Sequence, residues 1–317
     1  MVKCYVKTGH RLEIIKSLEV LRESKQQKNV MWIDMLRPTR KEVLEIEDMF
    51  DIKFPTKQES QEIEISSRYW EEDNRIEINS YFLISNEVNA YNETVSFVLQ
   101  NKLLFSIRYK ELNTFDEFSK RFLSTPKEFK NGFDIFSQIL DIRIDADADA
   151  IENLSREVVK LRRHVFSDYT NEDEEILEKI SIFEDLNMKI RENLTDKQRI
   201  LTSLLKSAAF REQSEDVLIM LKDIKSLIEH TDFNFERLDY LQSIFLGMLS
   251  IEQNKTVKLF TIVNVVFLPP TLIASLYGMN FKFMPELGWG YGYLFAIGLM
   301  IVSSITPLYI FRKKGWM

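Results

Sequence analysis

The apolar positions of the first 112 residues come in short runs that are typical of strands. Four runs rich in Ile, Val, Phe and Tyr predict strands at residues 29–35, 75–84, 93–99 and 103–109. The polar segment 100–102 between the last two strands predicts a hairpin turn. Thr39 and Glu42 have the spacing of a capping box, which predicts a helix directly after the first strand. This part of the chain is therefore expected to form a small α/β domain.

Beyond residue 112 the apolar positions recur every three or four residues, which is the period of an α-helix. The expected helical segments are 133–140, 158–165, 173–210, 213–229 and 238–248. A polar turn at 171–175 precedes the third segment, and the third and fourth are expected to form an antiparallel pair. The middle of the chain is thus predicted to be helical.

Two uncharged apolar runs, 259–276 and 291–311, dominate the last quarter of the chain. As helices they measure about 27 and 31 Å, which is enough to cross a bilayer. The alternative is a pair of buried helices in a soluble core, but aromatic residues such as Trp289 and Tyr309 flank the runs as they do in membrane proteins. Basic residues lie outside both runs, and the loop between them is charge-balanced. The positive-inside rule then places both chain ends in the cytoplasm.

The net charge is unevenly distributed along the chain. The 317 residues carry a net charge of −7, but residues 255–317 carry +5 and the remaining 254 residues carry −12. An acidic body argues against a nucleic-acid partner, because phosphate binding needs a cationic surface. It suits a membrane protein whose body attracts cations.

Motifs of common enzymes and cofactor sites are not found in the sequence. The single cysteine, Cys4, excludes an internal disulfide and a Cys-rich zinc site. The three histidines are widely separated, and the sequence contains no GxGxxG, GxxxxGK[ST], GxSxG or HExxH pattern. Residues 1–13 also lack the apolar core of a signal peptide. We therefore expect neither an enzyme nor a bound cofactor.

The segment between the two apolar runs carries the most specific motif. It reads Tyr277-Gly278-Met279-Asn280-Phe281, followed by Met284-Pro285-Glu286-Leu287. This resembles the CorA-type magnesium transporter family, whose hallmark is a GMN tripeptide at the end of the first span followed by an MPEL segment. The N-terminal half carries further similar residues: Trp32-Ile33-Asp34, Pro38-Thr39, Pro55-Thr56, Glu62-Ile63-Glu64 and Ser66-Ser67-Arg68. One departure is Gly315, which precedes Trp316 where relatives more often run basic residues straight into Trp.

The resemblance covers essentially the whole chain and implies its architecture. The implied fold class is an α/β cytoplasmic domain followed by long helices and two transmembrane α-helices, assembled as a homopentameric funnel-like channel. The expected divisions are an N-terminal cytoplasmic α/β domain at 1–112, a cytoplasmic helical region and stalk at 113–253, a first transmembrane, pore-lining helix at 254–277, a GMN/MPEL external loop at 278–290, a second transmembrane helix at 291–311, and a basic cytoplasmic tail at 312–317.

The chemistry of Mg²⁺ agrees with a GMN entrance. Mg²⁺ holds its water shell tightly, so a site that captures it should offer neutral oxygens to that shell. Asn280 supplies an amide oxygen, and Gly278 lets its own carbonyl approach without a side chain in the way. The resemblance implies a ring of such tripeptides, with Met279 at its middle position, as the ion entrance. Gly-Met-Asn also suits a helix C-cap and turn, and both interpretations can hold.

A stripe of small polar and aliphatic residues runs along one face of the first span. Its members are Asn254, Val257, Thr261, Asn264, Leu268, Thr271 and Ser275. Such a face packs against other helices or lines water. The resemblance favours pore lining, with polar rings at Asn254, Asn264 and Thr271 and an apolar, dewetting constriction at Val257, Phe260 and Leu268. Phe260 lies one residue off the stripe, and the Pro269-Pro270 pair is expected to kink the helix.

Acidic residues of the helical region are candidates for a regulatory site. Asp145-Ala-Asp147-Ala-Asp149 imitates the start of a calcium loop, but Ala150 and Arg156 occupy positions that need Gly and Glu, so it is no EF-hand. Asp145 and Asp149 belong to a helix face that is either simply solvated or a divalent-ion site between neighbouring domains. The resemblance implies that such a site closes the pore when internal Mg²⁺ is high. Asp216, Asp223 and Asp239 are equally eligible.

The expected function follows from this resemblance. It is influx of hydrated Mg²⁺, and also of Co²⁺ and Ni²⁺, across the cytoplasmic (inner) membrane, gated by intracellular Mg²⁺. The expected partners are further copies of the chain, membrane lipid and divalent cations. A zinc transporter of the same superfamily, with a GVN motif, is one alternative, which Met279 disfavours. A membrane-anchored ion-sensing scaffold is another, although it would need neither the polar stripe nor the GMN loop.

Overall fold

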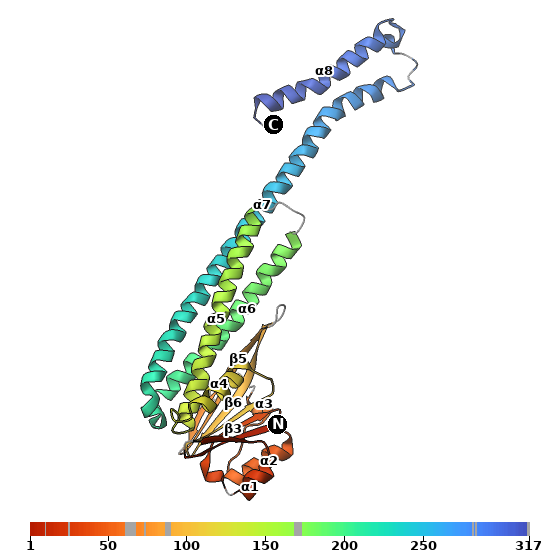
Figure 1. Cartoon of the computed structure of the whole chain (residues 1–317). Helices are drawn as coiled ribbons and strands as arrows, with labels where there is room; N and C mark the ends of the chain where they lie inside the picture. The colour runs from red at the N-terminus through yellow and green to blue at the C-terminus, as the bar shows by residue number, and fades with distance from the viewer. Residues whose placement is uncertain are drawn as a thin grey trace. The chain divides into compact units, whose positions relative to one another are not determined.

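The computed structural model of the chain describes residues 1–9, 11–24, 26–60, 68–72, 74–85, 90–167, 173–280, 282 and 284–315 (Figure 1). It divides into two compact units, Met1–Gln242 and Ser243–Met317. The boundary falls inside one long helix, α7, and each unit is considered by itself.

The first unit contains a sheet, short helices around it, and long helices. Its elements are β1 (Val2–Thr8), β2 (Arg11–Ile15), α1 (Leu18–Glu23), η1 (Gln27–Asn29), β3 (Val30–Leu36), α2 (Arg40–Phe50), α3 (Lys57–Ser60), β4 (Tyr69–Glu72), β5 (Arg75–Ser85), β6 (Ala90–Gln100), β7 (Leu103–Arg108), α4 (Asn113–Ser124), α5 (Gly132–Ser167), α6 (Asp173–Leu204), η3 (Ala208–Gln213) and the first part of α7 (Ser214–Tyr277).

The sheet has seven strands in the order β2-β1-β3-β7-β6-β5-β4. All neighbours are antiparallel except β3 and β7, which pair in parallel with Trp32 opposite Leu104. The β6–β7 connection is the tight turn expected from the sequence, and Asn101 and Lys102 both have positive φ, as a type I′ hairpin requires. The central strands are buried on both faces, so the sheet is the core of this unit.

Successive side chains of the central strands point to opposite faces of the sheet and enter two separate cores. On one face Trp32 of β3 stacks on Tyr5 of β1 at 4.2 Å and packs against phenylalanines of α4. On the other face Ile33 and Cys4 pack with residues of α1 and α2. The sheet is therefore covered on both sides, by α1 and α2 on one and by α4, α5 and α6 on the other.

The long helices of the first unit run side by side (Figure 1). Asn187 of α6 donates to the carbonyl of Thr231 in α7 at 2.9 Å, and Ser155 of α5 lies 2.9 Å from the amide oxygen of Asn234 in α7. The Asn187–Thr231 bond joins α6 to α7, in agreement with the predicted antiparallel pair, and the Ser155–Asn234 contact joins α5 to α7.

The second unit holds the rest of α7, a short turn η4 (Pro285–Gly288) and α8 (Gly292–Lys313). Among the described residues, two helices contain stretches long and apolar enough to cross a membrane, and they correspond to the two predicted spans. At most 6% of either stretch is buried within the chain. Their apolar side chains are thus available to lipid or to other protein chains.

Several elements differ from the sequence-based expectation. The predicted strands correspond to β3, β5, β6 and β7, and both bonds of the Thr39–Glu42 capping box are present, but β1, β2 and β4 were missed. The helix predicted at 173–210 was too long, because α6 ends at Leu204 and Phe210 has a non-helical backbone in the following 3-10 turn. The segments predicted separately at 213–229 and 238–248 belong to one continuous helix, α7.

Candidate ion-conduction site

The GMN tripeptide begins where α7 ends, at Tyr277. The Gly278 N–H donates to the Ala274 carbonyl at 2.9 Å and so closes the last turn of the helix. A Cβ at Gly278 would lie 3.2 Å from that carbonyl oxygen, closer than an ordinary van der Waals contact, so glycine serves close backbone approach here. Met279 is 47% exposed and Asn280 is also exposed. The tripeptide thus combines a helix end with an accessible amide.

The rest of the loop returns to α8 through a short turn. Pro285 opens the 3-10 turn η4, the Trp289 N–H donates to the Glu286 carbonyl at 3.3 Å, and the Gly292 N–H donates to the Trp289 carbonyl at 2.9 Å. The Trp289 ring packs against Phe295 of α8 with centroids 5.9 Å apart. Phe281 and Phe283 of the motif lie outside the described residues, as do residues 62–64, 66–67 and Trp316.

The predicted pore stripe lies on a different face of α7 from the one that meets α8. The eight predicted residues are all exposed: Asn254, Val257, Phe260, Thr261, Asn264, Leu268, Thr271 and Ser275. The partly covered positions of the span are instead Ile262, Val265, Val266, Pro269, Pro270, Ile273 and Tyr277, which recur with helical spacing on the opposite side. Ser304 of α8 donates to the Val266 carbonyl at 3.2 Å on that side. The stripe is therefore free in the single chain, and the helix continues through both prolines.

The two threonine hydroxyl groups of the stripe donate hydrogen bonds to their own helix. Thr261 donates to the Val257 carbonyl at 2.8 Å, and Thr271 donates to the Phe267 carbonyl at 2.7 Å. A hydroxyl whose proton is engaged in such a hydrogen bond can still accept hydrogen bonds through the lone pairs on its oxygen. Both threonines therefore present acceptor oxygens on the exposed face, which is the polarity that the outward-pointing protons of a hydrated cation require.

The candidate regulatory aspartates fall on two helices of the first unit. Asp145 and Asp149 lie on α5, and Asp216, Asp223 and Asp239 lie on α7. Burial raises the pKa of Asp145, and the negative charges of Asp149, Asp223 and Glu117 raise it further, so Asp149 and Asp223 both lie near enough to Asp145 to act on it. Asp239 lies sixteen residues beyond Asp223, roughly 24 Å along the helix. The structure therefore brings together only some of the five.

A polar cavity of about 250 Å³ lies between the start of α5 and the start of α7. Its lining includes Asp141 and Asp216, and burial, with the charges of Asp145 and Asp216, raises the pKa of Asp141. Buried Ser137 also lines it, and its hydroxyl has no hydrogen-bond partner among the described residues. Within the described residues no group of three or more His, Cys, Asp or Glu side chains is arranged to hold a metal ion.

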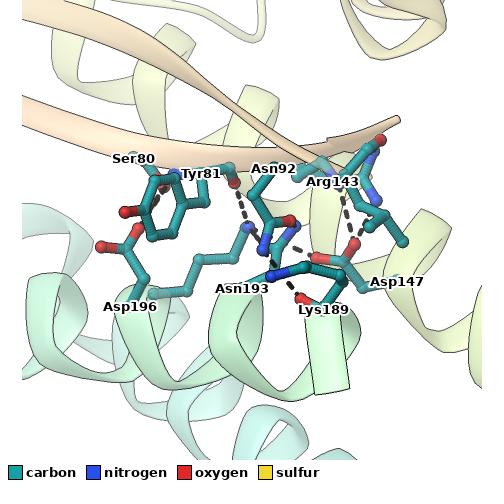
Figure 2. A network of polar contacts seen from close by, with 10 residues as sticks. Ser80, Tyr81, Asn92, Arg143, Asp147, Lys189, Asn193 and Asp196 are labelled. Atoms are coloured by element: carbon teal, nitrogen blue, oxygen red, sulfur yellow. Dashed lines mark hydrogen bonds and ion pairs between the residues drawn. The ribbon is translucent and has the colours of Figure 1, made fainter. Parts of the chain in front are cut away.

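Asp147, the middle residue of the calcium-loop imitation, has a structural role. It lies inside α5, fully buried, and pairs with Arg143 and with Lys197 of α6, whose Nζ is 3.4 Å away (Figure 2). Lys197 also donates to the Tyr81 carbonyl of β5 at 2.6 Å and to Asn193. The sequence reasoning rightly rejected an EF-hand but did not find this network, which joins α5 and α6 to the sheet.

A second buried carboxylate extends the same network. Asp196 accepts the Tyr81 N–H at 2.9 Å (Figure 2), and it also lies 3.6 Å from the guanidinium of Arg68. Burial raises the pKa of Asp196 in spite of these partners. The network thus holds three cationic side chains and two carboxylates, an excess of one positive charge. Only the helical spacing of Arg143 and Asp147 was a visible signal of it.

Comparison with known proteins identifies relatives that are similar over most of the chain. The chain is 48% identical over 295 residues to the magnesium transport protein CorA of Wolinella succinogenes, which covers 91% of this chain and 92% of that protein. It is 40% identical to the magnesium transport protein CorA of Campylobacter jejuni subsp. jejuni over 100% of both chains. It is 36% identical to the one of Escherichia coli strain K12, with 93% and 94% covered.

Solved structures share the fold at lower identity. The complete structure of the CorA magnesium transporter from Methanocaldococcus jannaschii is similar with a TM-score of 0.83 and 20% identity, covering 100% of this chain and 99% of that chain. The full-length CmaX protein is similar with a TM-score of 0.72 and 13% identity, covering 99% and 97%. The family model described as "CorA-like Mg2+ transporter protein" matches residues 27–313. The chain belongs to the CorA-like Mg²⁺ transporter family.

Proposed function

We propose that this chain is a subunit of a channel-like transporter that moves hydrated Mg²⁺ across a membrane. The observation that carries the proposal is the GMN turn at the end of an apolar helix whose polar face is exposed, in a chain that belongs to this family. The geometry of the turn and the chemistry of the face both suit an ion that keeps its water shell.

Capture of the ion takes place at Gly278, Met279 and Asn280. The Asn280 amide oxygen accepts hydrogen bonds from water molecules of the shell, so the ion is recognised without being dehydrated. The helix end holds that amide in place, because the Gly278 N–H is bonded to the Ala274 carbonyl. One amide oxygen per chain binds the hydrated ion weakly, but a ring of copies places several such oxygens around the same ion.

Conduction follows the exposed face of α7. Asn254, Asn264, Thr271 and Ser275 are its polar positions, with Thr261 beside them. Thr261 and Thr271 present acceptor oxygens to the water shell, since their protons are donated to the helix. Val257, Phe260 and Leu268 form an apolar constriction that closes the pore by dewetting when the helices approach each other.

Assembly is needed because one helix face cannot enclose a path. We propose a homopentamer, on the family resemblance, with the stripe of each copy turned inward and α8 turned toward lipid. It lies in the cytoplasmic (inner) membrane with both ends in the cytoplasm, as the basic ends of the spans suggest. A membrane potential of 100 mV then favours entry of a divalent cation by about 4.6 kcal/mol.

Regulation is assigned to aspartates of α5 and α7. The candidates remain Asp145, Asp149, Asp216, Asp223 and Asp239. Repulsion among neighbouring carboxylates is relieved when a divalent cation lies between them, which would favour the closed arrangement at high internal Mg²⁺. The support is that burial and the neighbouring charges of Asp149 and Asp223 raise the pKa of Asp145.

The test of the proposal is Mg²⁺ flux into liposomes that contain the purified full chain and a Mg²⁺-sensitive dye. Asn280→Ala should abolish the flux while the oligomer stays assembled in detergent, and Asn153→Ala, at an exposed position of α5, should leave it unchanged. Co²⁺ and Ni²⁺ should also enter. Flux that survives Asn280→Ala would refute the entrance. A wild-type chain that carries Zn²⁺ but not Mg²⁺, or no ion at all, would refute the transport proposal.

A further inference from the structure

Glu286 is the single carboxylate in residues 255–317, a segment that otherwise carries six basic side chains. It lies six residues after Asn280, in the loop that joins the two spans, and its side chain is exposed. Lys282 balances this charge in the loop as a whole, so a cation that approaches Asn280 is attracted only through the place where the Glu286 charge lies. The position of that charge depends on how the loop is held.

The backbone of Glu286 is held against the first residue of α8. The Trp289 N–H donates to the Glu286 carbonyl, and the Gly292 N–H donates to the Trp289 carbonyl, so the two bonds form successive turns that end on the helix. A Cβ built at Gly292 would lie 2.3 Å from the Glu286 carbonyl oxygen, far inside the 3.0 Å that real Cβ atoms respect. The turn can occupy this place only because residue 292 has no side chain.

The backbone conformation of residue 292 does not explain why this residue is a glycine. Gly292 is not among the glycines with positive φ, which in the described residues are Gly9 and Gly315. It is the first residue of α8, where helix propensity gives glycine no advantage over alanine. Gly288 and Gly290, in the same loop, have nothing within 4 Å of an added Cβ. Steric demand thus singles out Gly292.

We propose that Gly292 is a positioning residue of the ion entrance: it lets the 285–289 turn lie on the start of α8 and so fixes Glu286 where it attracts the incoming cation. A side chain at residue 292 displaces the Glu286 backbone and moves the carboxylate with it. The inference rests on the proposed transport function and adds to it a residue that acts through Glu286 without touching the ion.

The test compares Gly292→Ala with the matched control Gly290→Ala in the liposome flux assay. Gly292→Ala should raise the Mg²⁺ concentration for half-maximal flux roughly fivefold, with maximal flux retained, while Gly290→Ala should match the wild type. Glu286→Gln should raise it similarly, and Gly292→Ala should add nothing in the Glu286→Gln background. An unchanged half-saturation in Gly292→Ala, or an additive effect in the double variant, overturns the proposal.

Two further measurements keep the inference testable if Gly292→Ala does not assemble or the chain carries no Mg²⁺. Trp289→Ala removes the ring that packs on Phe295 without adding a clash, and it should raise half-saturation in the same Glu286-dependent way. Hydrogen exchange of the backbone amides of residues 289 and 292 should be faster in Gly292→Ala than in Gly290→Ala, whichever ion the chain carries. Slow exchange in both variants contradicts the proposed contact, whereas absent wild-type flux contradicts the transport function and the role of Glu286.

Discussion

Removal of the Lys197 amino group should change how the stability of the chain depends on pH. Lys197 is fully buried, and burial lowers its pKa to about 8 from 10.5 even though Asp147 beside it favours the charged form. Arg143, also in contact with Asp147, disfavours a second positive charge at this place. The folded chain therefore keeps this ammonium charged at neutral pH only at a cost.

The size and sign of the effect follow from this pKa. Between pH 8 and 10.5 the folded chain binds less of this proton than the unfolded chain, so the free energy of unfolding rises with pH across that window. The shift corresponds to about 3 kcal/mol, at ~1.4 kcal/mol for each pH unit. The contribution is fully present above pH 10.5 and is lost as the pH falls through 8. Lys197→Met has no titrating group at this position, so its free energy of unfolding should lack this rise with pH.

Thermal unfolding of the full chain in detergent, followed by the fluorescence of the buried Trp32, measures the difference. When the pH is raised from 7.5 to 10.5, the Tm of the wild type should rise relative to that of Lys197→Met by roughly 6–12 °C. This range follows from ~2–4 °C for each kcal/mol in a domain of this size. Using the variant as reference cancels other groups that titrate in this range, such as tyrosines. Parallel Tm curves for the two chains, or a wild type that loses stability relative to the variant, would refute the reasoning.

Three other outcomes are expected. Asp34→Ala removes the carboxylate partner of the buried Arg108 and should lower the free energy of unfolding by about 3–5 kcal/mol in denaturant melts. The control Lys41→Ala, in an exposed ion pair, should lower it by at most about 0.5 kcal/mol. Cys4, whose pKa burial raises to about 12, should react with a maleimide only on unfolding, and rapid labelling of the folded chain would contradict its burial. Asn264→Leu should reduce Mg²⁺ flux, whereas Ile262→Val, on the covered face of α7, should not; equal flux in both would exclude the stripe as the pathway.

Local signals in the sequence predicted those parts of the fold that local interactions determine. The capping box of Thr39 and Glu42 and the turn at Asn101 and Lys102 depend on neighbouring residues, and both were correctly predicted. Strand β1 was missed because Cys4, Tyr5 and Val6 are all buried in it and show no alternation. Its identity depends on pairing with β3, which is distant in sequence, as well as with the neighbouring strand β2.

The same distinction applies to the candidate site. Helical spacing placed Asp145 and Asp149 on one face and left Asp147 off it, and in the structure Asp147 is buried against Lys197, fifty residues away, while Asp145 is exposed. Periodicity placed these three on a helix but could not say which side the rest of the chain would cover. Burial by a distant element is what separates a structural carboxylate from an available one.

The polar stripe of α7 illustrates what one chain alone leaves open. From the sequence, the stripe had two interpretations, packing against another helix or lining water. In the structure α8 covers the opposite side of the span, where Ser304 bonds to the Val266 carbonyl, so the second span is not the partner of the stripe. A face with Asn264 is costly to leave in lipid, because the amide group of this side chain finds no partners there. Contact with further copies of the chain, or water enclosed between them, would satisfy it, and this supports the proposed assembly.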